Sequence, residues 1–239
     1  MRFHQFQETW HEKLQHLIQQ LKKAPSPPAT TEENNQLHHL VEKSLSHVMD
    51  YYLVKSAAVQ NDVLNVLAAP WATAFERSLH WIAGWRPTTA FQLIHTRSTM
   101  FIESRVYNML NGGLAFMTGD LGDLSADRFT SLSRLQCRTV QEENALSDQL
   151  SAWQACKYLD FNGVGELLLM KYEEEEFEEK MRDLAVIVQK ADELRVKTLR
   201  EVVQLLTPQQ ASEFFISASH LYFTVRDFGL NHDRQHHAS

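Results

Sequence analysis

The stretch from Pro70 to His95, PWATAFERSLHWIAGWRPTTAFQLIH, decides the fold class. Its apolar side chains recur at steps of three and four residues, which is the spacing of one face of a helix. These side chains are Trp71, Phe75, Leu79 and Ile82. Gly84 is typical of the residue that ends a helix, and Pro87 is typical of the first turn of the next one. The spacing therefore predicts two helices joined by a tight connection, an αα-hairpin at the centre of the core.

The composition extends this prediction to the whole chain. Among 239 residues, 44% are hydrophobic and only eight are Gly and six Pro, which favours helices over a turn-rich β fold. We expect an all-α bundle of about six to eight helices, the last two of them long. A single domain is expected over residues 1–229, followed by a flexible His-rich tail over 230–239.

The charge balance and the hydropathy exclude two classes of partner. Thirty acidic residues against 23 basic ones give a formal net charge of −7, which opposes binding to a phosphate backbone, so direct DNA binding is not expected. No apolar run is long enough for a transmembrane helix, and the amino-terminal residues do not resemble a signal peptide. The nucleus or the cytoplasm is therefore the expected compartment.

The amino-terminal segment 2–23 has the pattern of an amphipathic helix. Its apolar face is formed by Phe3, Phe6, Trp10, Leu14, Leu17 and Leu21. Such a helix either packs on the domain or docks onto a partner. A proline-rich loop follows over 24–32, and Thr30 with Glu33 predicts a capping box that opens the next helix.

Later caps and breakers divide the rest of the chain. A Gly-rich loop is expected over 111–124, and Ser125 is a good N-cap for a long helix that ends near Tyr158. The apolar seam of a second long helix, Glu166 to Leu206, is longer than one domain needs and suggests a homodimer. Thr207, Pro208 and Gln210 predict the start of the last helix, which we expect to end near Gly229.

Two blocks of sequence resemble one known family. The first block comprises Trp71, Glu76, Arg77, Trp81, Ile82, Gly84, Arg86 and Pro87, and the second comprises residues 191–195 with Thr198, Leu199, residues 205–207 and residues 209–211. Together they resemble the plant seed-dormancy control domain, which occurs alone in delay-of-germination proteins and as the C-terminal part of TGA-type bZIP transcription factors. The resemblance covers nearly the whole chain.

The resemblance implies a non-enzymatic regulator that binds other proteins. It implies a role in seed dormancy, seed maturation or the abscisic-acid response, or alternatively a pollen aperture factor that is peripheral to the plasma membrane. The implied partners are a signalling phosphatase and calmodulin, both at the first helix, or transcription factors. Trp10 matches the aromatic anchor of that helix, whereas Gln7 stands where the family has a tyrosine. The candidate partner-binding residues are Phe6, Trp10, Leu14, Trp71, Trp85 and Arg86.

No motif indicates catalysis or a metal site. The chain lacks the Gly-x-Ser-x-Gly, His-Glu-x-x-His and Cys-x-x-Cys patterns, so no catalytic residue and no cofactor are expected. The resemblance implies haem bound through two histidines of the last helix, but those positions are Tyr222 and Arg226 here, with His220 nearby. A sensor that encloses haem or an apolar ligand between the central hairpin and the last helix is therefore the alternative function, with His220 and Tyr222 as candidate ligands.

Overall fold

The computed structural model describes residues 3–111, 118–155 and 174–237, and no strand occurs among them. The elements are α1 (Phe3–Lys23), α2 (Thr31–Asn61), α3 (Val63–Ala68), α4 (Ala74–Ser78), α5 (Thr89–Leu110), η1 (Leu121–Asp123), α6 (Ala126–Gln154), α7 (Glu174–Leu205) and α8 (Pro208–His237). The predicted all-α fold with two long C-terminal helices is confirmed. The helix end expected near Tyr158 and the helix start expected at Glu166 lie outside the described residues.

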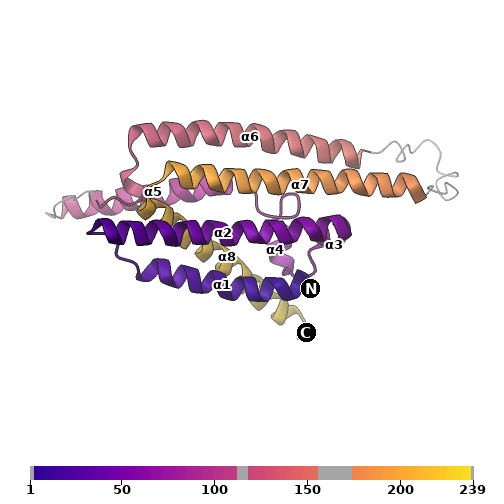
Figure 1. Ribbon diagram of the computed structural model, residues 1–239, viewed down its shortest axis with the longest axis horizontal. Coiled ribbons are helices and arrows are strands. Elements are labelled where there is room, and N and C mark those ends of the chain that lie inside the picture. Colours follow the sequence, from indigo (N-terminus) through magenta and orange to yellow (C-terminus); the bar gives the residue numbers. More distant parts are fainter. Residues whose placement is uncertain (1–2, 112–117, 156–173, 238–239) are drawn as a thin grey trace.

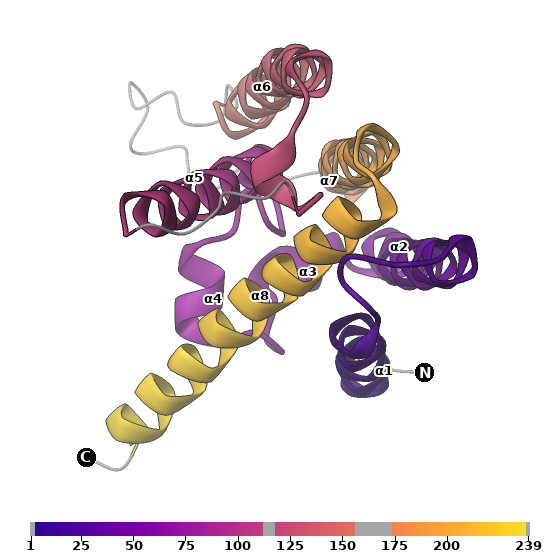
Figure 2. The ribbon, with the colours of Figure 1, turned by 90° about the vertical axis from the view of Figure 1, so that its left-hand side faces the viewer.

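Four long helices lie side by side in the order α6, α7, α2, α1 (Figure 1). Helix α8 crosses obliquely over α2 and α1, and α4 packs against it (Figure 2). The largest core cluster joins α1, α2 and α5 to α6, α7 and α8, with Phe91, Phe214 and Leu37 among its buried members. A second cluster lies where α7 meets α3 and α6. The first cluster positions the site described below.

The predicted helix starts are confirmed by their caps. Thr30 accepts a hydrogen bond from the backbone N–H of Glu33, and the Glu33 carboxylate accepts from the backbone N–H of Thr30, which completes a capping box. Ser125 caps α6. At the start of α8, the Thr207 hydroxyl accepts from the backbone N–H of Gln210, and the Gln210 side-chain oxygen accepts from the backbone N–H of Thr207. These local signals were reliable because each cap satisfies N–H groups that the helix itself leaves unpaired.

The central αα-hairpin is where the sequence prediction was wrong. Helix α4 ends at Ser78, and residues 79–88 form an irregular segment in place of the expected helix through Ile82. Ile82 and Ala83 have positive φ angles of 43° and 59°, a region that costs non-glycine residues free energy. Gly84 does not adopt that region; its missing side chain makes room for a guanidinium, because a Cβ there would lie 3.1 Å from Cζ of Arg195.

The last helix extends beyond the expected end. Helix α8 continues through Gly229 to His237, so most of the segment expected as a flexible tail is helical. Gly229 acts as a contact point, because a Cβ at this position would lie 2.1 Å from Oγ1 of Thr73 at the start of α4. Four residues later, Asp233 accepts a hydrogen bond from the backbone N–H of Ala74. Glycine therefore brings α8 close to α4 and does not end the helix.

The seam of α7 is covered within the chain. Its buried residues pack against α2, α3 and α6, and they include Leu184, Val188, Ala191, Leu194 and Val202. The length of this seam therefore gives no reason to expect a homodimer.

Candidate binding site

The irregular segment 79–88 is held by a buried arginine from α7. Arg195 is fully buried, and its guanidinium donates hydrogen bonds to the carbonyl of Trp85 at 2.7 Å, to that of Ile82 at 2.9 Å and to that of Trp81. The guanidinium carbon also lies 5.3 Å from the centre of the Trp81 ring, at cation–π distance. These bonds account for the unusual backbone, since the positive φ angles turn successive carbonyls towards one cation.

Lys55 of α2 and Asp192 of α7 complete this contact. Lys55 Nζ donates to the carbonyl of Ala83 at 2.7 Å and to Oδ1 of Asp192 at 2.8 Å, and Arg195 donates to the same oxygen at 2.6 Å. All three charged side chains are buried. Burial lowers the pKa of Lys55 to about 8. We call Lys55, Asp192 and Arg195 the buried triad.

A buried carboxylate from α6 fixes the other end of the segment. Glu143 accepts hydrogen bonds from the backbone N–H of Thr88 at 2.6 Å, from its hydroxyl at 3.1 Å and from Nε of Arg86 at 2.8 Å. Glu143 is 1% exposed, whereas the side chain of Arg86 is 49% exposed. Glu143 therefore satisfies the free N–H groups at the start of α5, where the Thr88 side chain makes no cap.

The two sequence blocks that carry the family resemblance meet at this point. The first block supplies the segment from Trp81 to Arg86, and the second supplies Asp192 and Arg195. More than 100 positions separate them in the chain. Their pairing explains why the two blocks belong together physically: one is the backbone that the other binds.

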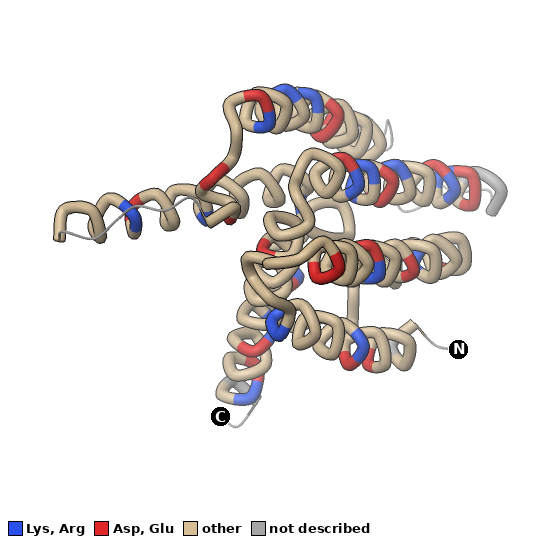
Figure 3. Tube along the Cα trace, turned by 60° about the vertical axis from the view of Figure 1, so that its left-hand side comes forward, with Lys and Arg blue, Asp and Glu red and all other residues tan. Residues whose placement is uncertain are grey.

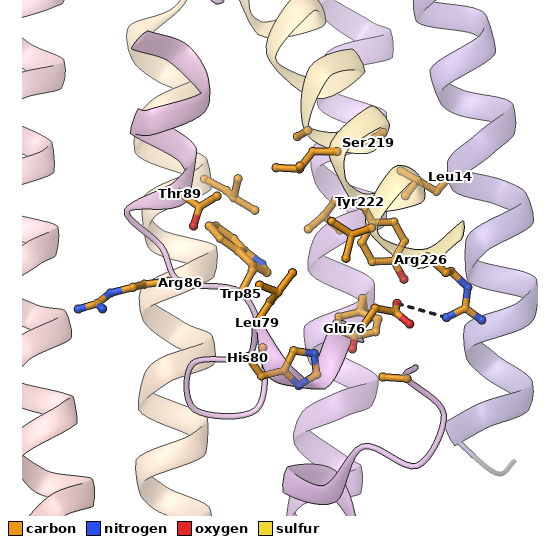
Figure 4. A pocket seen from close by; sticks show the side chains of 18 of the residues that line it. Leu14, Glu76, Leu79, His80, Trp85, Arg86, Thr89, Ser219, Tyr222 and Arg226 are labelled. Carbon is orange, nitrogen blue, oxygen red and sulfur yellow. Dashed lines mark hydrogen bonds and ion pairs between the residues drawn. The ribbon is translucent and has the colours of Figure 1, made fainter. Parts of the chain in front are cut away.

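Beside this segment lies a cavity of about 470 Å³ that is partly open to solvent and is lined by α1, α2, residues 69–93, Leu199 of α7, and α8 (Figure 4). Its walls are mainly apolar and aromatic, with Leu14, Trp85, Leu93, Phe214 and Phe215 among them. Polar groups at its edges are few and include the ion pair of Arg226 with Glu76 at 3.4 Å. The volume is in the range of sites for small organic molecules.

The structure brings most of the predicted site residues together around this cavity. Six of them line it, namely Trp10, Leu14, Trp71, Trp85, Arg86 and Tyr222. Phe6 and His220 do not line it, and His220 is exposed on α8. The sequence predicted Tyr222 as a ligand of a cofactor and the other five as part of a partner-binding surface. The fold turns all of these side chains inward except that of Arg86, which lies on the surface, and Leu14 is only 4% exposed.

The aromatic residues of α1 attach that helix to the domain. Trp10 Nε1 donates to the carbonyl of His47 at 2.9 Å, and His47 Nε2 donates to the carbonyl of Trp10 at the same distance. The rings of Phe3 and Trp71 are 4.7 Å apart, and Phe6 lies close to Tyr51. The apolar face of α1 is therefore occupied within the chain.

The residues on α8 do not fit haem bound through two histidines. At the two positions that the resemblance indicated, the Tyr222 hydroxyl is hydrogen-bonded to the ring of His11, and Arg226 is paired with Glu76. Burial raises the pKa of Tyr222 well above its usual range, which opposes the phenolate that would bind iron. No three His, Cys, Asp or Glu side chains gather as metal ligands among the described residues.

Four polar residues that shape the site were not among the predicted site residues. Lys55, Glu143, Asp192 and Arg195 were missed as functional residues because they lie on helices whose apolar spacing explained the fold without them. One signal was available: a charged residue on the buried stripe of a helix needs a partner. Arg195 is one turn after Ala191 and one turn before Thr198 and Leu199, all of which are buried.

A second candidate site is the exposed surface at the end of α5. This end projects from the bundle (Figure 1), and Figure 3 shows few charged residues on it. Its inner side is fixed by Arg105, which pairs with Asp120 and Asp123 beside η1. Its outer side carries Met100, Ile102, Val106, Tyr107, Met109 and Leu110, each about half exposed or more. We call these six residues the α5 surface.

In the described part of the chain, no helix combines the length and the apolar character that crossing a membrane requires.

Comparisons with known proteins agree with the resemblance. The family model described as seed dormancy control matches residues 14–96, which include the first block and much of the cavity wall. Protein DOG1-like 4 of Arabidopsis thaliana is 25% identical over 251 residues, covering 100% of this chain and 95% of that protein. Protein RESPONSE TO ABA AND SALT 1 of the same plant is 27% identical and covers 93% and 92% of the two chains. The bZIP transcription factor TGA10 of Nicotiana tabacum is 25% identical over 80% of this chain but only 34% of its own length. The chain is therefore similar to the seed dormancy control family, through the family model over residues 14–96 and through relatives along most of its length.

Proposed function

We propose that the chain is a non-enzymatic regulator of the response to abscisic acid and salt, and that it acts by docking onto a transcription factor. The names of its relatives describe regulators and bZIP factors. In TGA10 the shared region makes up about a third of the protein, so this fold is used there as a module of a transcription factor. The nucleus and cytoplasm are the compartments in which such a partner is met.

The α5 surface is the observation that supports docking. Leu110 is 82% exposed and Tyr107 is 69% exposed, although burying either would be favourable. Exposed apolar patches of this kind on one element mark protein contacts. Docking through α1 requires that helix to leave the domain, because Leu14, Leu17 and Leu21 are buried. The phosphatase and calmodulin interactions implied for the first helix are therefore less well supported than docking on α5.

A binding assay with matched variants tests this proposal. A purified TGA-type bZIP factor is immobilised, and the wild-type chain is compared with Val106→Glu on the α5 surface and Val140→Glu on the exposed side of α6. The carboxylate at position 106 would be desolvated in the complex, so binding is expected to weaken at least tenfold, by about 1.4 kcal/mol or more. Equal binding by all three proteins, or a loss shared by both variants, would exclude this docking surface.

The biological role is tested separately in plants. A line that lacks the protein is expected to germinate differently from the wild type on abscisic acid and on salt. Normal germination together with altered pollen apertures would favour the pollen aperture alternative.

A further inference from the structure

The cavity of about 470 Å³ is the feature that the docking function does not use. Its lining contains none of the residues of the α5 surface. Close packing leaves few hollows of this size in a protein, and the apolar walls of a hollow forfeit the contacts that packed side chains would make. A bound molecule would restore those contacts.

The charged groups at the cavity wall already have partners. Lys55 is paired with Asp192 at 2.8 Å, Glu76 with Arg226 at 3.4 Å, and Arg86 with Glu143 at 2.8 Å. The Arg86 side chain also points away from the cavity (Figure 4). A charged ligand would have to break one of these pairs, at a high cost where the partner left behind is buried.

The polar groups that remain available at the wall are neutral. The hydroxyls of Thr89 and Ser219 and the imidazole of His80 make no hydrogen bond within the described part of the chain. Burial lowers the pKa of His80, which keeps its ring uncharged at neutral pH. Each of the three groups can donate or accept a hydrogen bond. Figure 4 places Thr89 and His80 on opposite sides of Trp85, so polar groups face the cavity from two ends.

We propose that this cavity binds an uncharged, mainly apolar small molecule that carries hydroxyl or carbonyl groups. The apolar walls supply most of the affinity, and Thr89, Ser219 and His80 orient the polar groups of the ligand. The proposal is independent of docking on α5, because the two sites share no residue.

The first test measures whether the cavity takes up a neutral apolar molecule. N-phenyl-1-naphthylamine, whose fluorescence rises in apolar surroundings, is titrated into the full chain. We expect saturable binding that Ala218→Phe abolishes by filling the cavity, while Ala145→Phe on the exposed side of α6 has no effect. Circular dichroism checks folding, and Ser219→Leu replaces Ala218→Phe if that variant does not fold. No saturable binding to the folded wild-type chain would overturn the proposal.

The second test measures the preference for an uncharged ligand. Farnesol and farnesoic acid share a flexible carbon skeleton and differ at the end that carries the alcohol or the carboxylate. We expect farnesol to displace the probe at lower concentration than farnesoic acid. Thr89→Val should weaken the binding of farnesol about three- to tenfold, the effect of one hydrogen bond, and leave the affinity for the probe unchanged. Tighter binding of the acid, or equal loss of probe and farnesol in Thr89→Val, would refute the assigned ligand class.

Discussion

Replacement of Arg195 by leucine removes the cation that holds segment 79–88. The substitution leaves the carbonyls of Trp81, Ile82 and Trp85 without their donor, and Asp192 keeps only Lys55 as a partner. An unsatisfied buried polar group costs about 1–3 kcal/mol, and breaking a buried ion pair costs about 3–5 kcal/mol. These costs overlap, because the segment relaxes and takes up water. We therefore expect Arg195→Leu to lower the free energy of unfolding by about 3–5 kcal/mol, a large part of the 5–15 kcal/mol that is typical of a domain.

Urea unfolding followed by circular dichroism measures this loss, and two further variants make it specific. Arg138→Leu removes a half-exposed arginine that pairs with Glu201 and Glu142, and it should cost no more than about 1 kcal/mol. Arg195→Lys keeps the charge but not the planar fork that reaches three carbonyls, so it should rescue little of the stability. If Arg195→Leu unfolds at the same urea concentration as Arg138→Leu, the reasoning about the buried triad is wrong.

Three further changes test separate parts of the structure. Burial lowers the pKa of His11 to about 4, below its ordinary value of 6.5, so the unfolded chain binds the proton first and stability should fall as the pH drops from 6.5 towards 4. His11→Gln should reduce the difference in the free energy of unfolding between pH 7 and pH 5.5, measured by urea unfolding. An equal difference in wild type and variant would contradict the role given to His11. Gly229→Ala should destabilise by about 1–3 kcal/mol through overlap with Thr73, although helix propensity alone predicts a gain of about 1 kcal/mol; a higher melting temperature would show that α8 can move. Glu143→Gln should lower the free energy of unfolding by about 1–3 kcal/mol, because the amide cannot accept all three hydrogen bonds. An unchanged melting temperature in calorimetry would show that Glu143 does not stabilise the start of α5.

The sequence predicted the helix starts correctly, because they depend on interactions between residues close together in the chain. The caps at Thr30, Ser125 and Thr207 satisfy backbone groups within four residues, so their pattern is visible in the chain. The failure at Ile82 and Ala83 has the opposite origin. Their backbone conformation depends on an arginine more than 100 positions away, which local spacing does not encode.

The candidate site was predicted in composition but not in arrangement. The aromatic residues Trp10, Trp71 and Trp85 were identified because large amphipathic rings dominate binding sites. Whether such rings face a partner or the interior depends on how α1 and α8 pack, and that is a long-range property. The α5 surface was not among the predicted sites, although Ile102, Val106 and Leu110 follow one another at the four-residue spacing of a helix face. Their exposure follows from the projection of α5 beyond its neighbours, as Figure 1 shows.

The meeting of the two blocks gives the cavity a fixed wall. Trp85 faces the cavity and Arg86 faces the surface. Both lie on a segment whose carbonyls accept hydrogen bonds from Arg195 and Lys55. A regulator that binds a ligand in this cavity and a partner on α5 would hold both sites on one bundle, since α5 begins at the same segment. The two binding tests described above measure each site separately.

Amide hydrogen exchange of the chain with and without a TGA-type bZIP factor tests the proposed docking on α5 most directly. We predict that partner binding slows exchange in residues 99–110 of α5, while α1 is unchanged. Slower exchange confined to residues 3–23, with 99–110 unaffected, would show that the partner docks on the first helix and would contradict this account.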